Sequence, residues 1–386
     1  MRVAIAPDSF KGCLSATEVA EAIATGLRAV WPEIEIACVP MADGGEGTAD
    51  VWMRARSGEW VSYDCTDGLG RAISARVGWI DDGATAIVEA ARAVGLDLLT
   101  SAERNPWIVS SFGLGELVRQ VLAEPNVKTI WLTLGGSATV DGGLGCLQAL
   151  GIPIETAEGD PVPRGGRGLS RVTRVDWSKL PDRLRSDRPD AVDLCVACDV
   201  TNPLLGNIGA ARVFGPQKGA DPDMVEQLER GMQNWASQSD RRDVADSPGA
   251  GAAGGLGFAL GCLGAEFYSG IGRTIETVNL AEHLHWADWV ITGEGRCDRQ
   301  TAAGKVVSGV LAEARKYQRP VVVLAGGVDV SAVDELMTLG ATAVMAATPA
   351  PGAVEDIIAN GAANLQWSAR NIAGLIQLGQ TLGTTS

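Results

Sequence analysis

The sequence predicts an α/β protein with a doubly wound, mostly parallel sheet domain and a second α/β domain inserted in it. Apolar, strand-like segments alternate with segments of helical periodicity near both ends of the chain, which is the pattern of parallel β-α-β units. Polar, glycine-bearing loops follow the carboxyl ends of these strands, where open α/β sheets bind their ligands. The length of 386 residues is more than one domain usually holds.

The first β-α-β unit occupies the N-terminus. Residues 2–6 form a short apolar strand, and Ser15 with Glu18 forms the capping box of a helix. Apolar residues at helical spacing carry this helix toward Pro32, which ends it. Residues 33–41 then supply a second strand, so this segment predicts one complete β-α-β unit.

The C-terminal part repeats the pattern. It predicts strands at residues 289–292, 321–327 and 342–347, and helices at residues 306–317 and 353–371. Because the polar loops of both ends follow strands, we expect the two ends of the chain to share one sheet.

The middle of the chain differs in its sequence pattern: it has extended segments, glycine- and proline-rich stretches and a polar region at residues 155–193. We therefore assign residues 1–64 and 284–386 to a discontinuous Rossmann-like or flavodoxin-like α/β domain. Residues 65–283 are assigned to the inserted α/β domain.

Composition excludes several functional classes. The net charge of −15 repels nucleic-acid phosphates and anionic lipid, so neither nucleic acid nor a membrane is an expected partner. The first apolar segment is too short for a signal peptide, and no apolar run reaches the roughly 20 residues of a membrane span. The expected location is the cytoplasm. The eight cysteines lack the spacing of a disulfide scaffold and are expected to be reduced thiols.

Five polar loops carry the residues that could perform chemistry. They are residues 7–12, 42–48, 135–145, 198–219 and 292–305. Their glycines permit positive φ angles and close backbone approach, so successive N–H groups can bind an anion, and neighbouring carboxylates can bind Mg²⁺. The third loop is the best phosphate cradle, because an apolar strand runs into Gly135, Gly136 and Ser137 and a helix is expected to begin near Gly142. Any one loop alone could also be only a tight turn.

Lysines and carboxylates in these loops are the candidate catalytic groups. Three lysines could contact phosphate or a substrate carboxylate, or could be solvated surface charges: Lys11, Lys218 and Lys305. Seven carboxylates are present: Asp8, Asp43, Glu46, Asp141, Asp199, Glu294 and Asp298. Mg²⁺ needs only one or two of them, so turn and helix capping is expected to use others.

Phosphoryl transfer also needs a group that accepts the proton of the substrate hydroxyl. Asp199 is the first choice for this base because it ends an apolar strand and precedes Asn202 and Pro203. Asp43 is nearly as good on the same grounds, and the sequence leaves both open.

Several familiar site motifs are missing. Arg299 and Val306 occupy positions where a phosphate-binding P-loop around Lys305 would require glycine and Ser or Thr. The protein-kinase motifs and a nucleophile elbow are absent as well. With only two histidines in the chain, His283 and His285, histidine acid-base chemistry is not expected.

Six strings in order resemble the bacterial glycerate kinase family. They are PDSFKG-x-LSA, P-x-ADGGEGT, GGSAT-x-DGG-x-G, CDV-x-NPL-x-G, VFGPQKGA and ITGEGR-x-D-x-QT-x-x-GK. The likeness spans nearly the whole chain. It implies an ATP- and Mg²⁺-dependent kinase that phosphorylates glycerate, most commonly to 2-phosphoglycerate, on a two-domain α/β fold. The implied partners are glycerate and ATP, and a homo-oligomer stays open.

The loops and the resemblance together define the candidate site. The catalytic candidates are Lys11, Asp43 and Asp199, and the candidate Mg²⁺ ligands are Asp199 and Asp298. The candidate substrate- and phosphate-binding residues are Asp8, Ser9, Gly44, Gly45, Glu46, Gly135, Gly136, Ser137, Asp141, Asn202, Gln217, Lys218, Glu294, Arg296, Gln300, Thr301 and Lys305.

The sequence departs from the family pattern at two positions, and rival functions have different degrees of support. Cys13 stands where the family commonly has Ser, and Val140 where it commonly has Asn, which removes a polar contact to ligand. A kinase that gives 3-phosphoglycerate or acts on another small hydroxy acid stays an alternative, as does a non-catalytic binding protein on the same scaffold. A dinucleotide-dependent oxidoreductase is not supported, because no G-x-G-x-x-G follows the first strand.

Overall fold

The computed structural model describes residues 1–298, 301 and 306–383, and contacts divide the chain into two compact units. Unit 1 comprises Met1–Asp43 and Ile271–Ser386, and unit 2 comprises Gly44–Gly270. These boundaries follow residues 43 and 270, whereas the sequence analysis placed them after residues 64 and 283. The predicted domains, residues 1–64 with 284–386 and residues 65–283, stay a prediction.

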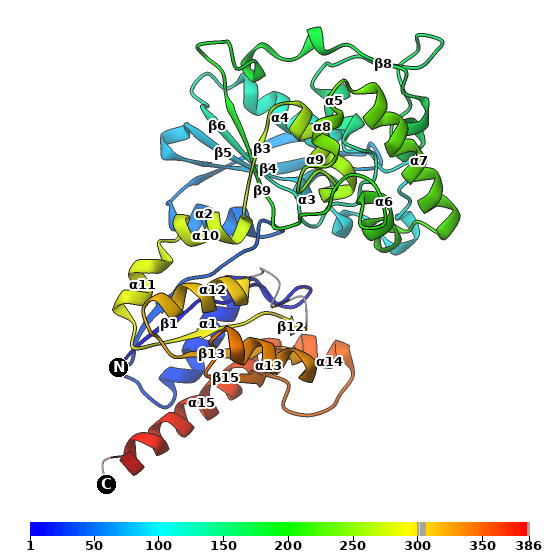
Figure 1. The fold of residues 1–386 in the computed structure, drawn as a ribbon. Helices are drawn as coiled ribbons and strands as arrows, with labels where there is room; N and C mark the ends of the chain where they lie inside the picture. The colour runs from blue at the N-terminus through cyan, green and yellow to red at the C-terminus, as the bar shows by residue number, and fades with distance from the viewer. Residues whose placement is uncertain (299–300, 302–305, 384–386) are drawn as a thin grey trace. The chain divides into compact units, whose positions relative to one another are not determined.

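Unit 1 is built on a five-stranded, fully parallel sheet (Figure 1). Its spatial order is β15 (Ala343–Ala346), β13 (Val321–Ala325), β11 (Trp289–Thr292), β1 (Arg2–Ile5) and β2 (Glu35–Cys38). Within this unit the order is therefore 2-1-3-4-5, the flavodoxin-like order in which the chain changes direction between β1 and its third strand, here β11.

Helices lie on both faces of this sheet. The helix α1 (Ala16–Arg28) packs on α15 (Gly361–Gly383), and their core contains Val3, Ile5 and Ile291 of the strands. Three further helices contact one another in series: α11 (Leu280–Trp286), α12 (Val306–Lys316) and α13 (Val330–Leu339). The helix α12 also contacts β11 and β13. Helices therefore cover both faces of the sheet, which is the doubly wound arrangement.

The prediction of one continuous helix at residues 353–371 is wrong, because the structure has two helices there. The chain forms α14 (Val354–Ala359) and then begins α15 at Gly361. A Cβ atom at Gly361 would lie 2.3 Å from the Cys13 Sγ atom, so glycine lets the start of α15 approach the loop that follows β1.

Unit 2 is built on a six-stranded mixed sheet. Its order is β10 (Glu266–Tyr268), β9 (Asp193–Ala197), β6 (Thr129–Thr133), β5 (Thr85–Glu89), β4 (Ala72–Ile80) and β3 (Glu59–Thr66). The first four strands are parallel, and β4 and β3 run antiparallel at the edge.

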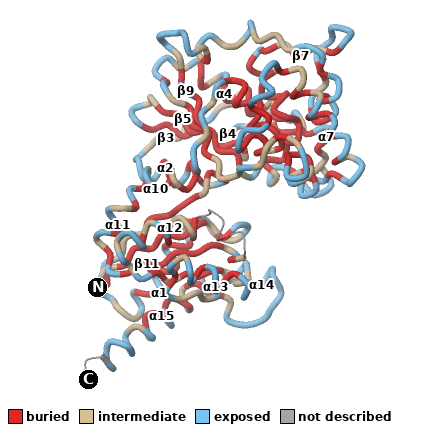
Figure 2. The backbone as a smooth tube through the Cα atoms, viewed as in Figure 1, coloured by how far each residue is buried: buried red, intermediate tan, exposed pale blue. Residues whose placement is uncertain are grey.

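The helices of unit 2 are α2 (Thr48–Ala55), α3 (Ala90–Val94), α4 (Phe112–Ala123), α5 (Leu144–Ala149), α6 (Ala210–Phe214), α7 (Pro222–Gln238), α8 (Arg242–Ala245) and α9 (Ala252–Cys262). All of them except α2 contribute residues to one large core against this sheet. Trp52 of α2 instead packs edge to face on Trp131 of β6. Trp235 of α7 and Phe258 of α9 meet edge to face, with ring centroids 5.5 Å apart. Figure 2 shows that buried residues gather inside each unit, along central strands such as β11 and β5, and that exposed residues lie mostly on the outside.

Smaller elements complete the description. The helix α10 (Gly270–Thr277) begins at the boundary between the units, β12 (Arg296–Cys297) pairs with β14 (Gly327–Val328), and β7 (Ile154–Glu155) pairs with β8 (Arg174–Val175). Among the residues that the structure describes, no helix is long and apolar enough to cross a bilayer. The eight cysteines, all of which lie in the described part of the chain, form no disulfide with one another.

Candidate active site

A cavity of about 660 Å³ lies in unit 1 beside the loops that follow β1, β11 and β13. Its charged and polar lining includes Asp8, Ser9, Lys11, Asp43, Glu294, Arg296 and Asp298, all of which the sequence analysis selected. The cavity therefore sits at the carboxyl ends of parallel strands, around the point where the sheet order reverses.

Backbone contacts hold these loops together. The Asp8 N–H donates to the Gly293 carbonyl at 2.8 Å, which joins the loop after β1 to the loop after β11. A Cβ atom at Gly326 would lie 2.5 Å from the Gly295 carbonyl oxygen, so the loops after β11 and β13 can meet only because this position is glycine. The charged side chains are thus mounted on rigid strand ends.

The Asp8 carboxyl has the most perturbed electrostatics in this cavity. Its pKa is raised from 3.8 to about 7, chiefly by burial and then by repulsion from Asp43, with a smaller effect from Glu294. The Ser9 N–H, which donates to Asp8 at 2.7 Å, and the charge of Lys11 act in the opposite direction. Negative charge in this cavity therefore exceeds what the neighbouring protein groups compensate.

The loop after β11 is partly described. The Asp298 N–H donates to the Thr301 hydroxyl at 2.9 Å, and the Thr301 N–H donates back to the Asp298 carbonyl at 3.0 Å. Thr301 is fully buried and closes this turn, whereas Asp298 lines the cavity. The candidates Gln300 and Lys305 lie outside the described residues.

In unit 2, two of the predicted glycine loops touch each other. A Cβ atom at Gly135 would lie 2.5 Å from the Gly45 Cα atom, and Gly44 and Gly136 adopt positive φ angles of 84° and 75°. The exposed Glu46 lies beside Gly136. The loop after β6 and the loop that leads into α2 therefore form one glycine-lined surface.

Lys218 lies beneath this surface. Its ammonium donates to the Ser137 hydroxyl at 3.1 Å and to the Thr139 carbonyl at 2.8 Å. Burial lowers the pKa of Lys218 from 10.5 to about 7, and the charge of Asp141 partly offsets this effect. Because Lys218 occupies one oxygen lone pair of Ser137, the serine O–H remains available as a donor.

Asp141 is enclosed by protein donors. Its carboxylate accepts hydrogen bonds from the N–H and O–H of Ser111, the O–H of Ser110, and the N–H groups of Gly143 and Gly145. Burial raises its pKa, and these hydrogen bonds oppose the rise. These contacts join the start of α4 to the turn before α5, so we infer that Asp141 positions the loop.

Asp199 follows β9, as predicted. Its Oδ1 atom accepts hydrogen bonds from the Ser269 hydroxyl at 2.8 Å and the Gly270 N–H at 3.0 Å. Asn202 donates its side-chain N–H to the Ile208 carbonyl at 2.7 Å, and Gln217 is exposed in the 3₁₀ turn that ends at Lys218. Asn202 thus supports its own loop.

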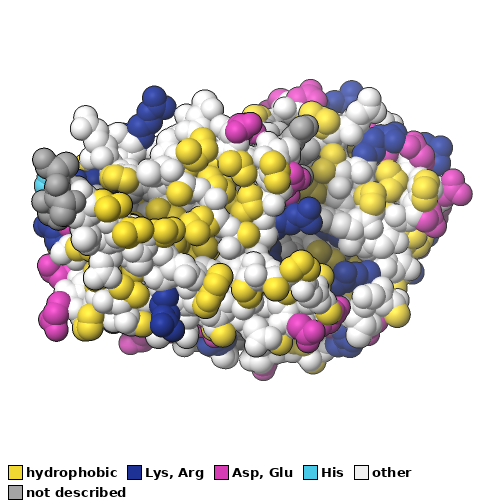
Figure 3. All heavy atoms as spheres, turned by 90° about the horizontal axis from the view of Figure 1, so that it is seen from below, with side chains coloured by type: hydrophobic (Ala, Val, Ile, Leu, Met, Phe, Trp, Pro, Cys, Tyr) yellow, Lys and Arg dark blue, Asp and Glu magenta, His cyan; other side chains and the backbone are white. Residues whose placement is uncertain are grey.

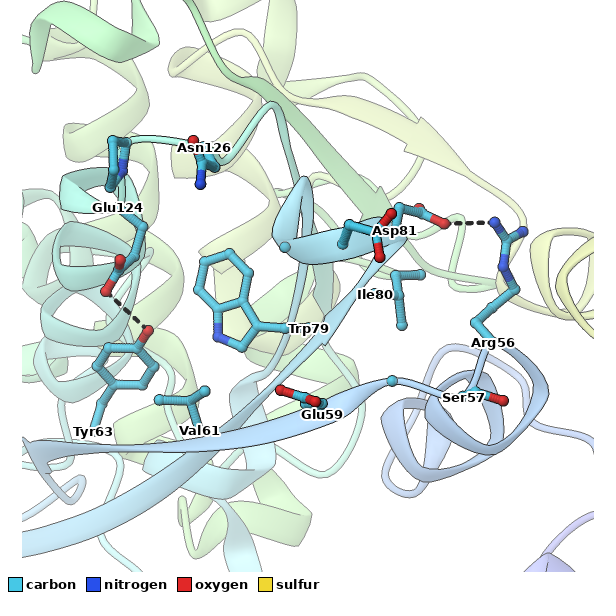
Figure 4. A pocket seen from close by; sticks show the side chains of 14 residues that line it. Arg56, Ser57, Glu59, Val61, Tyr63, Trp79, Ile80, Asp81, Glu124 and Asn126 are labelled. Carbon is cyan, nitrogen blue, oxygen red and sulfur yellow. Dashed lines mark hydrogen bonds and ion pairs between the residues drawn. The ribbon is translucent and has the colours of Figure 1, made fainter.

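A second cavity, of about 760 Å³, lies in unit 2 near the start of β5 and of β6 (Figure 4). Trp79 forms part of its lining, the Tyr63 hydroxyl donates to Glu124 at 3.3 Å, and Arg56 pairs with Asp81. This is the amino end of the parallel strands, away from the end where Gly135 and Asp199 lie. None of the candidate site residues lines it.

With this geometry in place, the profile of the Glycerate kinase family matches residues 3–377. The chain belongs to the glycerate kinase family. It is 42% identical over 385 residues to the Glycerate 2-kinase of Escherichia coli K12, a match that covers 98% of this chain and 99% of that protein. It is 40% identical over 388 residues to the Glycerate kinase of Bacillus subtilis 168, with 99% of each chain covered.

A crystal structure described as glycerate kinase 2 from Salmonella typhimurium LT2 is similar to this chain with a TM-score of 0.82 and 42% identity, covering 99% of both chains. The predicted family, the α/β fold class and the assignment as a kinase are thereby confirmed. The glycerate kinase motifs fall on the loops described above.

Sequence reasoning missed two groups of residues in this glycerate kinase fold. Val354, Ile357 and Ile358 line the cavity of unit 1 from α14. Glu89 ends β5, is buried, and accepts hydrogen bonds from the Ala49 N–H at 3.0 Å and from Arg92. The position of Glu89 at the end of an apolar strand was the available signal for it, whereas short apolar spacing at α14 looks like ordinary helix packing.

Proposed function

We propose that the chain is an ATP-dependent glycerate kinase that transfers the γ-phosphoryl group to the 2-hydroxyl of D-glycerate, giving 2-phosphoglycerate and ADP. The observation that carries this proposal is a cavity lined by Asp8, Lys11, Asp43 and Glu294 at the strand ends of a glycerate kinase family fold. The name of the Escherichia coli relative supports the position of transfer.

The residues suggest a division of tasks. A general base should have a pKa near the operating pH, and the Asp8 carboxyl has a pKa of about 7. Asp8 therefore joins Asp43 and Asp199 as a candidate acceptor of the hydroxyl proton. Lys11 is exposed at the cavity and is proposed to neutralise charge on the transferred phosphoryl group.

A kinase of this kind would use Mg²⁺, and the residues of unit 1 fit this ion. Repulsion between Asp8 and Asp43 shows that the cavity has negative charge for a cation to compensate. Among the described residues, no group of three or more potential ligands converges on one point. Mg²⁺ needs only one or two carboxylates beside nucleotide phosphates, so Asp298 in unit 1 stays a proposed ligand, as does Asp199 in unit 2. When bound, the ion would neutralise phosphate charge.

The buried pair of Lys218 and Ser137 is proposed to serve anion binding in unit 2. The glycine loops present backbone N–H groups, and a serine O–H beside them can donate to a carboxylate or phosphate oxygen. Lys218 touches Ser137 and would act through it, as a positioning residue.

The experiment that tests this function measures ADP release by the purified chain with Mg·ATP and either D-glycerate or L-glycerate. The position of the phosphate in the product is read by ³¹P and proton NMR. Formation of 2-phosphoglycerate from D-glycerate is the expected result. A 3-phosphoglycerate product would correct the position, turnover of another hydroxy acid alone would correct the substrate, and binding without any turnover would favour a non-catalytic protein.

Two further expectations belong to the same proposal. We place the enzyme in the cytoplasm, in keeping with eight cysteines that are expected to be reduced. A homo-oligomer remains open to measurement by light scattering.

A further inference from the structure

The unit 1 cavity also has an apolar side, to which the proposed phosphoryl transfer assigns no role. Val354, Ile357 and Ile358 of α14 line it, together with Val328 of β14. Val354 is 63% exposed and Ile358 is 41% exposed. Large aliphatic side chains that stay exposed at the edge of a cavity are a typical feature of a ligand-binding surface. We call Val354, Ile357 and Ile358 the α14 wall.

The cavity is too large for glycerate alone. Its volume is about 660 Å³, within the range of roughly 300–1,000 Å³ that accommodates drug-sized ligands. Glycerate has about seven non-hydrogen atoms and a nucleoside triphosphate has about 30, so the second ligand matches this size range better. Glycerate also has no apolar surface that could cover the α14 wall.

Polarity is distributed unevenly around the cavity. Most charged groups, among them Asp8, Lys11 and Glu294, come from the loops after β1 and β11, whereas the α14 wall comes from a separate helix that follows β15. Asp329 and Asn364 also line the cavity, near its apolar residues in the sequence. A ligand that fits this arrangement has a highly charged end and a flat apolar end. A nucleotide has both, in its metal-bound phosphates and its base.

Chain topology supports the same ligand. The cavity lies around the carboxyl ends of β1 and β11, where the 2-1-3-4-5 order of the sheet reverses. Open parallel sheets of this order leave a crevice at that point, and nucleotide ligands bind there in general.

We propose that the cavity of unit 1 is the nucleotide site, with the adenine ring against the α14 wall and the phosphates toward the loops after β1 and β11. This inference rests on the proposed function and adds to it the placement of the base. Exposed apolar side chains elsewhere in unit 1, such as Val330 and Met337 of α13, do not line the cavity. Figure 3 shows that hydrophobic side chains are frequent on the face seen from below, so exposure alone does not identify the wall.

The test uses the variant Val354→Gln with Ile358→Gln and the matched control Val330→Gln. Val354 and Val330 are both exposed valines at the first position of a helix in unit 1. Affinities for Mg·ADP and for magnesium with inorganic tripolyphosphate, which lacks a base, are measured by titration calorimetry. The KM values for ATP and glycerate are measured beside them.

The double variant is expected to weaken Mg·ADP binding and to raise the KM for ATP by about tenfold, because two apolar contacts to the base are lost. Tripolyphosphate affinity and the KM for glycerate should stay within twofold, and Val330→Gln should change none of these values. A raised KM for glycerate with unchanged Mg·ADP binding would overturn the proposal, and so would equal loss of ADP and tripolyphosphate binding or no change at all.

Two controls keep the outcomes separable. Circular dichroism checks folding, and the single variant Val354→Gln replaces the double variant if that one does not fold. Wild-type protein that binds Mg·ADP through the α14 wall but does not phosphorylate glycerate would refute the proposed substrate and leave the nucleotide site standing. Turnover of glycerate by the wild type, with no change of Mg·ADP binding in the α14 wall variants, would refute the placement of the base and leave the proposed substrate standing.

Discussion

Replacing Lys218 with methionine should remove a specific pH dependence from the stability of unit 2. The Lys218 ammonium is buried and has a pKa of about 7, against an ordinary value of 10.5. Between these two pH values the unfolded chain holds a proton on this lysine that the folded chain has released. The folded state therefore gains stability as pH rises from 7 toward 10.5, and below pH 7 this contribution is constant.

The size of the effect follows from the same linkage. One proton of difference gives a slope of about 1.4 kcal/mol per pH unit, so the wild-type protein should gain roughly 2 kcal/mol between pH 7 and pH 9 from Lys218 alone. Methionine has a similar length and no charge, so Lys218→Met loses this gain. The variant also loses the hydrogen bonds to Ser137 and Thr139, which lowers its stability by an amount that does not depend on pH.

The assay is urea denaturation at pH 6, 7, 8 and 9, followed by tryptophan emission, with fits to the transition that the substitution moves. The quantity compared is the difference in unfolding free energy between wild type and Lys218→Met. Lys179→Met, which removes an exposed lysine of unit 2, is the control. A difference that stays constant within about 0.5 kcal/mol from pH 7 to pH 9 would refute the reasoning.

Three further substitutions test other parts of the site. Asp8→Asn should melt at a higher temperature than wild type at pH 8, because the raised pKa of Asp8 means that its ionisation costs stability as pH rises toward and through 7. A lower melting temperature at pH 8 would contradict this reasoning. The kcat/KM of Asp8→Asn should fall at least tenfold. Gly135→Ala places a methyl group 2.5 Å from the Gly45 Cα atom and should cost about 1–3 kcal/mol in thermal unfolding, whereas Gly374→Ala, which meets no atom within 4 Å, should be neutral or slightly stabilising. Asp141→Asn sets an amide N–H against a ring of donors and should destabilise the protein by about 2–4 kcal/mol in urea, so an unchanged midpoint would show that the carboxylate is not needed there.

The sheet of unit 1 was largely predictable because its signals are local. The capping box of Ser15 and Glu18 is present at the start of α1 as expected, and β11 occupies residues 289–292 as expected. The sequence pattern predicts no helix between β13 and β15, where the structure forms α13 (Val330–Leu339). The break before Gly361 also escaped prediction, and the close approach of this glycine to Cys13, far away in the sequence, has no local signal.

The candidate residues were easier to find than their environments. Polar residues after apolar strands identified Asp8, Lys11 and Glu294, which do share one cavity. Burial was not visible in the sequence: Lys218 and Asp141 lie in glycine-rich loops that look exposed, and both are enclosed by the protein. Their burial depends on how distant loops fold over them, which no local pattern encodes.

The split of unit 1 along the chain has a consequence for synthesis on the ribosome. Strands β1 and β2 are made first, yet β11, the neighbour of β1 on its other side, and α15, which packs on α1, come after all of unit 2. At roughly 5–20 residues per second, the first strands wait on the order of tens of seconds for these partners. Unit 2 is one continuous segment and can complete its own core during that interval. The N-terminal strands are therefore the part of the nascent protein that a chaperone would have reason to shield.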